Sequence, residues 1–201
     1  MASSSRSFLR STGVAVRLIV LATVVLGVAY PLAVWGVGQA AFHDQANGSM
    51  VTDSSGTAVG SSLIGQSFTG KDAARWFQSR PSAAGEDGYD ANASSGSNLG
   101  PSNPDLTTAI EERRAAIAKA DGVPASEVPA DALTASGSGL DPDISPEYAA
   151  LQVSRVASAR GVSEARVRAL VAAHTESRQL GFLGSPAVNV LELNLALAKL
   201  G

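Results

Sequence analysis

Few side chains in this sequence are suited to acid–base, nucleophilic or metal chemistry. The 201 residues include two histidines, His43 and His174, three lysines and no cysteine. Without cysteine, the chain has no thiolate zinc site, no disulfide scaffold and no cysteine nucleophile. The two histidines lie far apart in the sequence and the carboxylates are scattered. The sequence therefore predicts no metal site.

Motifs for phosphate binding and for serine hydrolysis are also missing. None of the three lysines lies in a G-x-x-x-x-G-K-[ST] loop, in which backbone amides and a lysine bind phosphates. The turn at residues 137–139 does not have the G-x-S-x-G spacing of a nucleophile elbow. Asp141 and Asp143 lie where a helix is expected to begin, and acids are stabilised there without a catalytic role. We therefore expect no catalytic residue and no tightly bound cofactor.

His174 leaves one enzymatic alternative open. It continues an apolar stripe formed by Val167, Leu170 and Val171, at the spacing of one helix face. A histidine in such a stripe is usually a core residue, and we favour this interpretation. An exposed His174 paired with a carboxylate would instead indicate a membrane-anchored or secreted hydrolase or binding module. The substitution His174→Phe distinguishes the two, because a core site tolerates it and a catalytic base does not.

An apolar stretch near the N-terminus precedes most of the chain and anchors the residues that follow it. Residues 18–42 contain no ionisable side chain other than Tyr30. As a helix they are roughly 37 Å long, against about 30 Å for the hydrocarbon core of a bilayer. We therefore predict a single transmembrane helix over residues 18–40.

The charges on the two sides of this helix are unequal. Arg6, Arg10 and Arg17 precede it, and all 18 acidic residues follow it, beginning at Asp44. Positive charge favours the cytoplasmic side. We predict a single-pass protein of the cell membrane, with residues 1–17 as a cytoplasmic tail and residues 43–201 as an extracytoplasmic domain.

A cleaved signal peptide is the alternative interpretation of the same stretch. Its apolar region would run from Leu18 to Ala29, and small residues near Ala40 and Ala41 would form the cleavage site. The apolar stretch continues past Pro31, however, which makes it longer than the usual 7–15 residues of such a region. A retained anchor is therefore favoured.

The predicted domain begins with β structure and is acidic. Residues 50–68 indicate a hairpin around a turn at residues 53–56. Trp76 and Phe77 are expected in the core. Residues 43–201 contain 12 Lys and Arg against 18 Asp and Glu. This acidic balance argues against nucleic acid as a partner.

Four helices are predicted from their capping residues, after Asn103, Ser145, Ser163 and Asn189. Two of them begin with proline at the first position, and two of them end at glycine, Gly122 and Gly161. The fold class is therefore α+β: a transmembrane helix, then a mostly helical domain with a small β element at its N-terminal end.

A polar segment, residues 78–103, separates the β region from the helices. It is rich in Gly, Ser, Asn and Ala, and such long segments are either disordered or functional. Both interpretations stay open from composition alone.

Part of this segment is repeated later in the chain. Residues 95–101 and 136–142 share the pattern S-G-S-x-L-x-P. Two such turns could present a row of backbone N–H groups, or they could simply lead into two helices. The second interpretation is favoured.

Five motifs follow one another after residue 78: SRPSAAG, YDANASSGSNLGPSNPDL, SGSGLDPDISP, QVSRVASARG and VNVLELNLAL. With the N-terminal apolar helix, they resemble the KdpC family, the C subunits of Kdp-type high-affinity potassium-transporting ATPases, over nearly the whole chain. Two features differ from the family pattern. Asp143 stands where the family usually has histidine, and the spacer GEDGYD at residues 85–90 is longer than usual.

The resemblance implies a non-catalytic accessory subunit of an ATP-driven potassium uptake system. Its partners would be a potassium channel-like subunit, a P-type ATPase subunit and a small peptide subunit, together with membrane lipid. Such subunits are described as catalytic chaperones that raise the ATP affinity of the ATPase subunit, so ATP is expected only through that partner. From an extracytoplasmic domain, this effect must be transmitted indirectly.

Contacts with partner subunits are expected in the polar segment, because it holds the most specific motifs. The hypothesis is that the domain covers the outer mouth of the channel-like subunit and that this contact orders residues 78–103. The expected contact residues are Arg80, Pro81, Ser97, Asn98, Gly100 and Pro101.

Overall fold

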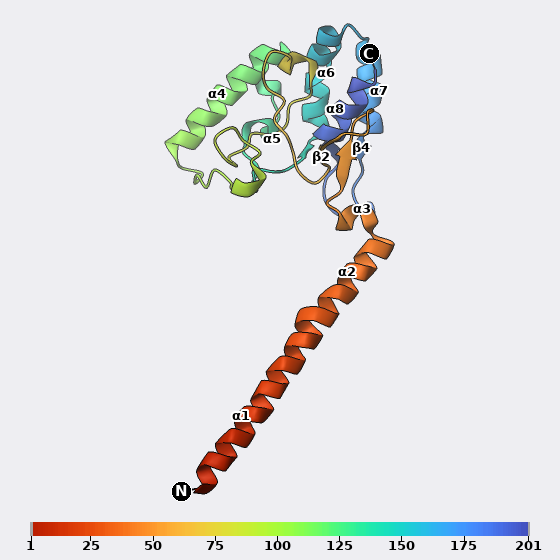
Figure 1. Ribbon diagram of the computed structural model, residues 1–201. Helices are drawn as coiled ribbons and strands as arrows, with labels where there is room; N and C mark the ends of the chain where they lie inside the picture. The colour runs from red at the N-terminus through yellow and green to blue at the C-terminus, as the bar shows by residue number, and fades with distance from the viewer. Residues whose placement is uncertain (1, 201) are drawn as a thin grey trace. The chain divides into compact units, whose positions relative to one another are not determined.

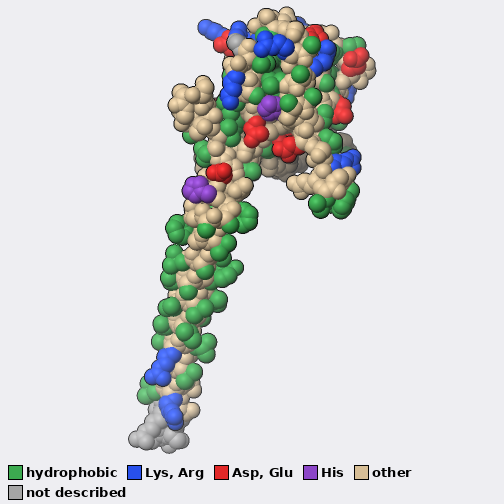
Figure 2. Space-filling model, turned by 90° about the vertical axis from the view of Figure 1, so that its right-hand side faces the viewer, with side chains coloured by type: hydrophobic (Ala, Val, Ile, Leu, Met, Phe, Trp, Pro, Cys, Tyr) green, Lys and Arg blue, Asp and Glu red, His purple; other side chains and the backbone are tan. Residues whose placement is uncertain are grey.

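The computed structural model describes residues 2–200, which divide into an N-terminal unit up to Ser49 and a second unit from Met50 onward (Figure 1). The N-terminal unit contains α1 (Ala2–Ala22), a π-helical stretch (Thr23–Ala29) and α2 (Tyr30–Ala41). The part from Ser7 to Ala41 is long and apolar enough to cross a membrane. Hydrophobic side chains cover its visible face in Figure 2, and Lys or Arg side chains lie toward its N-terminal end.

The π-helical stretch directly precedes the proline of the apolar helix. Pro31 has no backbone N–H and cannot complete the hydrogen bond to the carbonyl four residues earlier. A wider helical turn accommodates such an interruption. The helix thus continues through Pro31 into α2 by changing its hydrogen-bonding pattern over Thr23–Ala29.

A short helix, α3 (His43–Ala46), follows α2 within the same unit. The side-chain amide of Asn47 donates to the His43 carbonyl at 2.7 Å and to Oε1 of Gln39 at 3.1 Å. These bonds fix the chain where it leaves the long helix. The remaining residues before Met50 are a short connection to the second unit.

The second unit begins with the predicted hairpin. Strands β1 (Met50–Thr52) and β2 (Ala58–Ser61) pair antiparallel. In the turn, Oδ1 of Asp53 accepts from the backbone N–H groups of Ser55 at 2.8 Å and Thr57 at 3.0 Å. The prediction of a hairpin with this turn is confirmed.

The four predicted helices are present, with the predicted caps. The side chains of Asn103, Ser145, Ser163 and Asn189 each accept a backbone N–H in the first turn. Glycines in the left-handed conformation end two of the helices. The helices are α4 (Pro104–Asp121), α6 (Pro146–Arg160), α7 (Glu164–Ala173) and α8 (Val190–Ala198).

Shorter helical turns connect these elements. They are the 3-10 turns Ala73–Arg75, Ala91–Ala93 and Ala125–Glu127, and the single-turn helix α5 (Ala130–Leu133). In Figure 1, α6 lies between α4 on one side and α7 with α8 on the other.

A second sheet was not expected from the sequence. Strands β3 (Asp143–Ile144), β5 (Ala187–Asn189) and β4 (Thr175–Glu176) form it in that order, all antiparallel. The prediction placed β structure only at the N-terminal end of the domain, and in this respect it was incomplete. Strands of two or three residues show no alternation of apolar and polar residues, so their pairing depends on distant parts of the chain.

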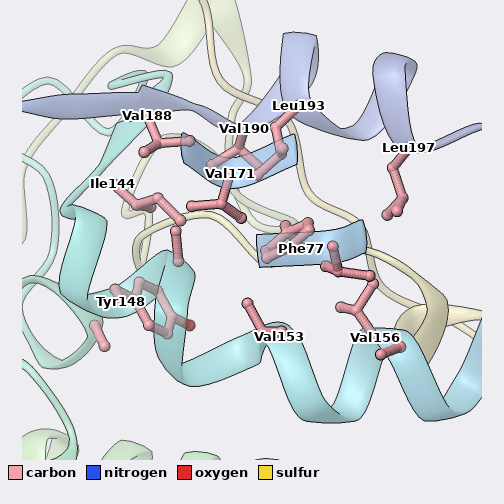
Figure 3. Close-up of a cluster of buried hydrophobic side chains, with 14 of the residues drawn as sticks. Phe77, Ile144, Tyr148, Val153, Val156, Val171, Val188, Val190, Leu193 and Leu197 are labelled. Atoms are coloured by element: carbon pink, nitrogen blue, oxygen red, sulfur yellow. The ribbon is translucent and has the colours of Figure 1, made fainter. Parts of the chain in front are cut away.

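The core of the domain lies between α6, the second sheet and α8. Figure 3 shows side chains from these elements converging around Phe77, which is fully buried. Trp76 is partly buried against this cluster, and the guanidinium of Arg160 lies 4.3 Å from its ring centroid. The prediction that Trp76 and Phe77 belong to the core is confirmed.

Candidate partner-contact surface

Contacts with residues 136–142 hold the polar segment, residues 78–103. The backbone N–H of Ser136 donates to the Pro81 carbonyl at 3.0 Å. The hydroxyl of Ser82 donates to the Gly139 carbonyl at 2.7 Å, and that of Ser94 to the Ser138 carbonyl at 2.9 Å. Contacts within the chain thus hold the segment in this structure, and the hypothesis that a partner subunit orders it stays a prediction.

The two S-G-S turns pack directly on each other. A Cβ atom at Gly96 would lie 2.9 Å from the carbonyl oxygen of Gly137, and one at Gly139 would lie 2.5 Å from that of Ser95. Gly139 also has a positive φ of 69°. Only glycine permits such an approach of two backbones. The repeated motif is thus a pair of structural turns that contact each other.

Ser82 and Tyr89 organise the part of the segment before these turns. The hydroxyl oxygen of Ser82 accepts from the backbone N–H groups of Ala84 at 3.1 Å and Tyr89 at 2.9 Å. The hydroxyl of Tyr89 donates to the Arg80 carbonyl at 2.7 Å. Burial raises the pKa of the Tyr89 hydroxyl, which stays protonated and keeps this donor.

Arg80 links the same segment to the second turn. Its guanidinium lies 2.7 Å from Oδ2 of Asp141, and the two side chains are 24% and 30% exposed. Nε of Arg80 is buried and has no hydrogen-bond partner among residues 2–200. The Arg80 side chain therefore holds the polar segment in place from within the domain, and Pro81 beside it is also half-buried.

The other four expected contact residues lie on the surface. Ser97, Asn98, Gly100 and Pro101 are exposed, and Asn98 has a positive φ of 53°. A Cβ atom at Gly100 would meet nothing within 4 Å. The six expected contact residues thus divide into an internal pair, Arg80 and Pro81, and an exposed turn at residues 97–101.

Two neighbouring cavities lie beside this network, toward α4. The first, of about 370 Å³, is lined by both basic and acidic side chains, among them Arg80, Arg113, Glu86 and Asp87. The second, of about 430 Å³, is lined mainly by apolar groups of α4 and includes Ile117. The mixed charges of the first cavity do not select a ligand of one sign.

Neither histidine forms an ion pair with an acidic side chain among residues 2–200. His174 is half-buried at the C-terminal end of α7, and its Nδ1 donates to the Leu170 carbonyl at 2.9 Å. Within the stripe that predicted a core position, Val167 and Val171 are buried. Among residues 2–200, no group of three or more potential metal ligands is clustered.

Comparison with known proteins identifies the family. The family model of the K⁺-transporting ATPase c chain, KdpC, matches residues 12–199. The chain belongs to the KdpC family. The protein named "Potassium-transporting ATPase KdpC subunit" of Kineococcus radiotolerans is 57% identical over 197 residues, which cover 98% of this chain and 97% of that protein.

KdpC subunits of other bacteria match at similar levels. The protein of the same name from Mycobacterium tuberculosis is 54% identical over 92% of this chain and 96% of its own length. That of Caulobacter vibrioides is 56% identical over 88% of this chain and 87% of its own length. The prediction of KdpC family membership is confirmed.

Asp143, which differs from the expected KdpC pattern, lies in a group of acids. It is half-buried in β3 and lines a cavity of about 280 Å³ together with Glu176. Burial raises the pKa of the Asp143 carboxyl, and the negative charges of Asp141, Glu176 and Glu192 raise it further. A histidine at this position would instead be stabilised in its charged form by the same neighbours.

Sequence reasoning missed two side-chain amides of the KdpC motifs. Asn194 of α8 bonds both the N–H and the carbonyl of Phe77, each at 2.9 Å. Gln152 of α6 does the same for Gln78, at 2.6 and 3.1 Å. Both side chains are buried. The sequence does contain a signal for them, because each is a polar residue at a helix position where the pattern of core residues calls for an apolar one.

Proposed function

We propose that this chain is the non-catalytic accessory subunit of an ATP-driven potassium uptake complex. Similarity to KdpC subunits along nearly the whole chain carries this proposal. The fold supports it, because an apolar helix long enough to cross a membrane precedes a domain built on a rigid polar network. In this role the chain stabilises the assembled complex.

The partners in this proposal are the channel-like subunit, the P-type ATPase subunit and the small peptide subunit. The exposed turn at residues 97–101 is the proposed contact with the channel-like subunit at its outer mouth. Arg80 and Pro81 act in this contact indirectly, by fixing the turn from inside the domain. A rigid turn loses little conformational entropy when it binds.

The effect on ATP is proposed to be indirect. With three arginines before the membrane helix and all acidic residues after it, the domain lies outside the cell and ATP lies inside. The chain then acts as a catalytic chaperone by favouring the ATP-binding state of the complex through its membrane helix or the channel-like subunit. No ATP site of its own is part of this proposal.

The substitution Gly100→Arg tests the contact without disturbing the fold, since a side chain at this position meets open space. We expect it to lower recovery of the channel-like subunit, and with it of the P-type ATPase subunit, with the C-terminally tagged chain in mild detergent, and to raise the KM for ATP of the remaining complex. Ser126→Arg, at an exposed position in the turn Ala125–Glu127, is the matched control.

Two results would contradict this proposal. If the tagged wild-type chain elutes alone as a monodisperse species, the role in a complex is wrong. If the complex forms but Gly100→Arg and Ser126→Arg give the same subunit recovery and the same KM for ATP, the turn at residues 97–101 is not the contact.

A further inference from the structure

The loop between β4 and β5 exposes large apolar side chains. Leu180 is 83% exposed, Phe182 69% and Leu183 46%. Among residues 50–200, the other large hydrophobic side chains that are this exposed are Met50 and Leu63, both in the region of the first hairpin. Three such residues within four positions form a concentrated apolar tip, defined here as residues 180–183.

The tip is held in shape by its own backbone. The N–H groups of Phe182 and Leu183 both donate to the Gln179 carbonyl, at 3.2 and 2.9 Å. Leu180 has a positive φ of 53°, which is unfavourable for a residue with a bulky side chain. The turn therefore presents the apolar side chains in a fixed arrangement, at a cost in local backbone energy.

The tip has charges of both signs beside it. Arg178 precedes it in the sequence, while Asp143 and Glu176 line a cavity together with Leu183. These charges do not select a partner of one sign. Exposed aliphatic and aromatic side chains of this kind match the lipid–water interface of a bilayer.

We propose that the apolar tip inserts into the lipid–water interface of the membrane that anchors the chain. Residues 42–49 connect the long helix to the first strand, and eight residues span at most about 30 Å. This connection keeps the domain close to the bilayer surface, so that a weak contact is sufficient. The inference rests on the membrane helix and not on the proposed role in a potassium pump.

The size of the tip favours lipid over a protein partner. A stable protein interface buries about 800 Å² on each partner, far more than three side chains supply. Insertion into a bilayer interface requires no matching surface, because its strength increases with the apolar area that leaves water. The tip would act as a second, reversible attachment beside the membrane helix.

Fluorescence quenching in vesicles tests this inference with the full-length chain. Because the protein has no cysteine, a dye is attached at a single introduced one: Ser185→Cys beside the tip, or Ser126→Cys as an exposed control. The vesicles contain phosphatidylglycerol, phosphatidylcholine and a nitroxide-labelled lipid. We expect the lipid nitroxide to quench the dye at residue 185 about twofold or more above the control, and aqueous iodide to show the opposite order.

A variant of the tip shows whether these side chains make the contact. In the Ser185→Cys background, Leu180→Asn with Phe182→Ser removes the apolar groups, and asparagine tolerates the positive φ at position 180. We expect quenching by lipid to fall to the level of the control. Equal quenching at residues 185 and 126 in the wild-type chain, or unchanged quenching in the tip variant, would overturn the inference. Protection from iodide only when the other subunits are present would assign the tip to a protein contact instead.

Discussion

Two side-chain amides take the place of a neighbouring strand for Phe77 and Gln78. Asn194 and Gln152 each satisfy the N–H and the carbonyl of one of these residues from opposite helices. A buried backbone group without a partner costs about 1–3 kcal/mol. The polar residues in the KdpC motifs therefore stabilise an irregular segment at the centre of the core.

At Gly96, a single methyl group is expected to destabilise the domain. In Gly96→Ala the new Cβ lies 2.9 Å from the backbone oxygen of Gly137, and one of the two turns must shift. We expect a loss of roughly 1–3 kcal/mol in the free energy of unfolding. Gly137→Ala on the facing turn is the control, because its Cβ meets nothing within 4 Å. Urea titration compares the two, and equal unfolding midpoints would show that the turns are not in tight contact.

Asp143 is expected to make stability depend on pH. Since its pKa is raised in the folded state, the folded chain binds the proton more tightly than the unfolded chain. This tighter proton binding increases the free energy of unfolding. The increase is fully present below a pH of about 4, the pKa of the carboxyl in the unfolded chain, and it is lost as the pH rises through the pKa in the folded chain. Asp143→Asn should therefore stabilise the domain at pH 7 by at most about 1 kcal/mol.

Thermal unfolding at several pH values checks this expectation. The difference between Asp143→Asn and the wild type should shrink as the pH falls toward 4. Asp87→Asn, at an exposed position, serves as the control. A difference that stays constant from pH 7 to about pH 4 would contradict the assignment of the effect to this carboxyl.

At the scale of elements, one buried ion pair joins α4 to the core helix α6. Nε of Arg155 lies 2.7 Å from Oδ1 of Asp121, and the two side chains are 10% and 5% exposed. Nη1 of Arg155 also donates to the carbonyls of Ala73, Ala74 and Trp76. Burial raises the pKa of Asp121, against the opposing effect of Arg155.

Arg155→Met is expected to destabilise the domain strongly. It leaves Asp121 buried without its partner, which costs roughly 3–5 kcal/mol. The double variant Arg155→Met with Asp121→Leu should lose less, since no unpaired charge remains. Chemical denaturation of both variants measures the difference. If the double variant is as unstable as the single one, the carbonyl contacts of Arg155 matter more than the ion pair.

The helices were predictable from the sequence because their signals are local. Asn103, Ser145, Ser163 and Asn189 lie within three residues of the N–H groups that they cap. The second sheet was not predictable, since Ile144 pairs with Val188 across 44 positions. Short strands of this kind are specified by the packing of the helices around them.

The contact surface was predictable in part, for the same reason. We expected Arg80, Ser97 and Asn98 to belong to one contact surface, because all three lie in the same polar segment. Their burial differs because residues 136–142 cover one part of the segment and leave the other exposed. No pattern within the segment itself shows which part is covered.

At the scale of the whole molecule, the unequal charges around the membrane helix determine the expected orientation. Arg10 and Arg17 lie toward one end of the candidate membrane helix, and no acidic residue precedes Asp44. With the N-terminus inside the cell, a C-terminal tag should be digested by protease added to intact spheroplasts. A cytoplasmic marker protein is the control for lysis. Protection of the tag until the membrane is disrupted would reverse the orientation.

The contact between the two glycine turns brings residues 96 and 137 together and closes a loop that contains α4 and α5. The ends of this loop are therefore fixed beside each other, while residues 124–127, between α4 and α5, are exposed. Exposed sites of this kind tolerate inserted domains, provided that the chain enters and leaves at nearly the same place. A fluorescent reporter inserted after Ser126 would then follow this subunit in living cells, with both termini left free.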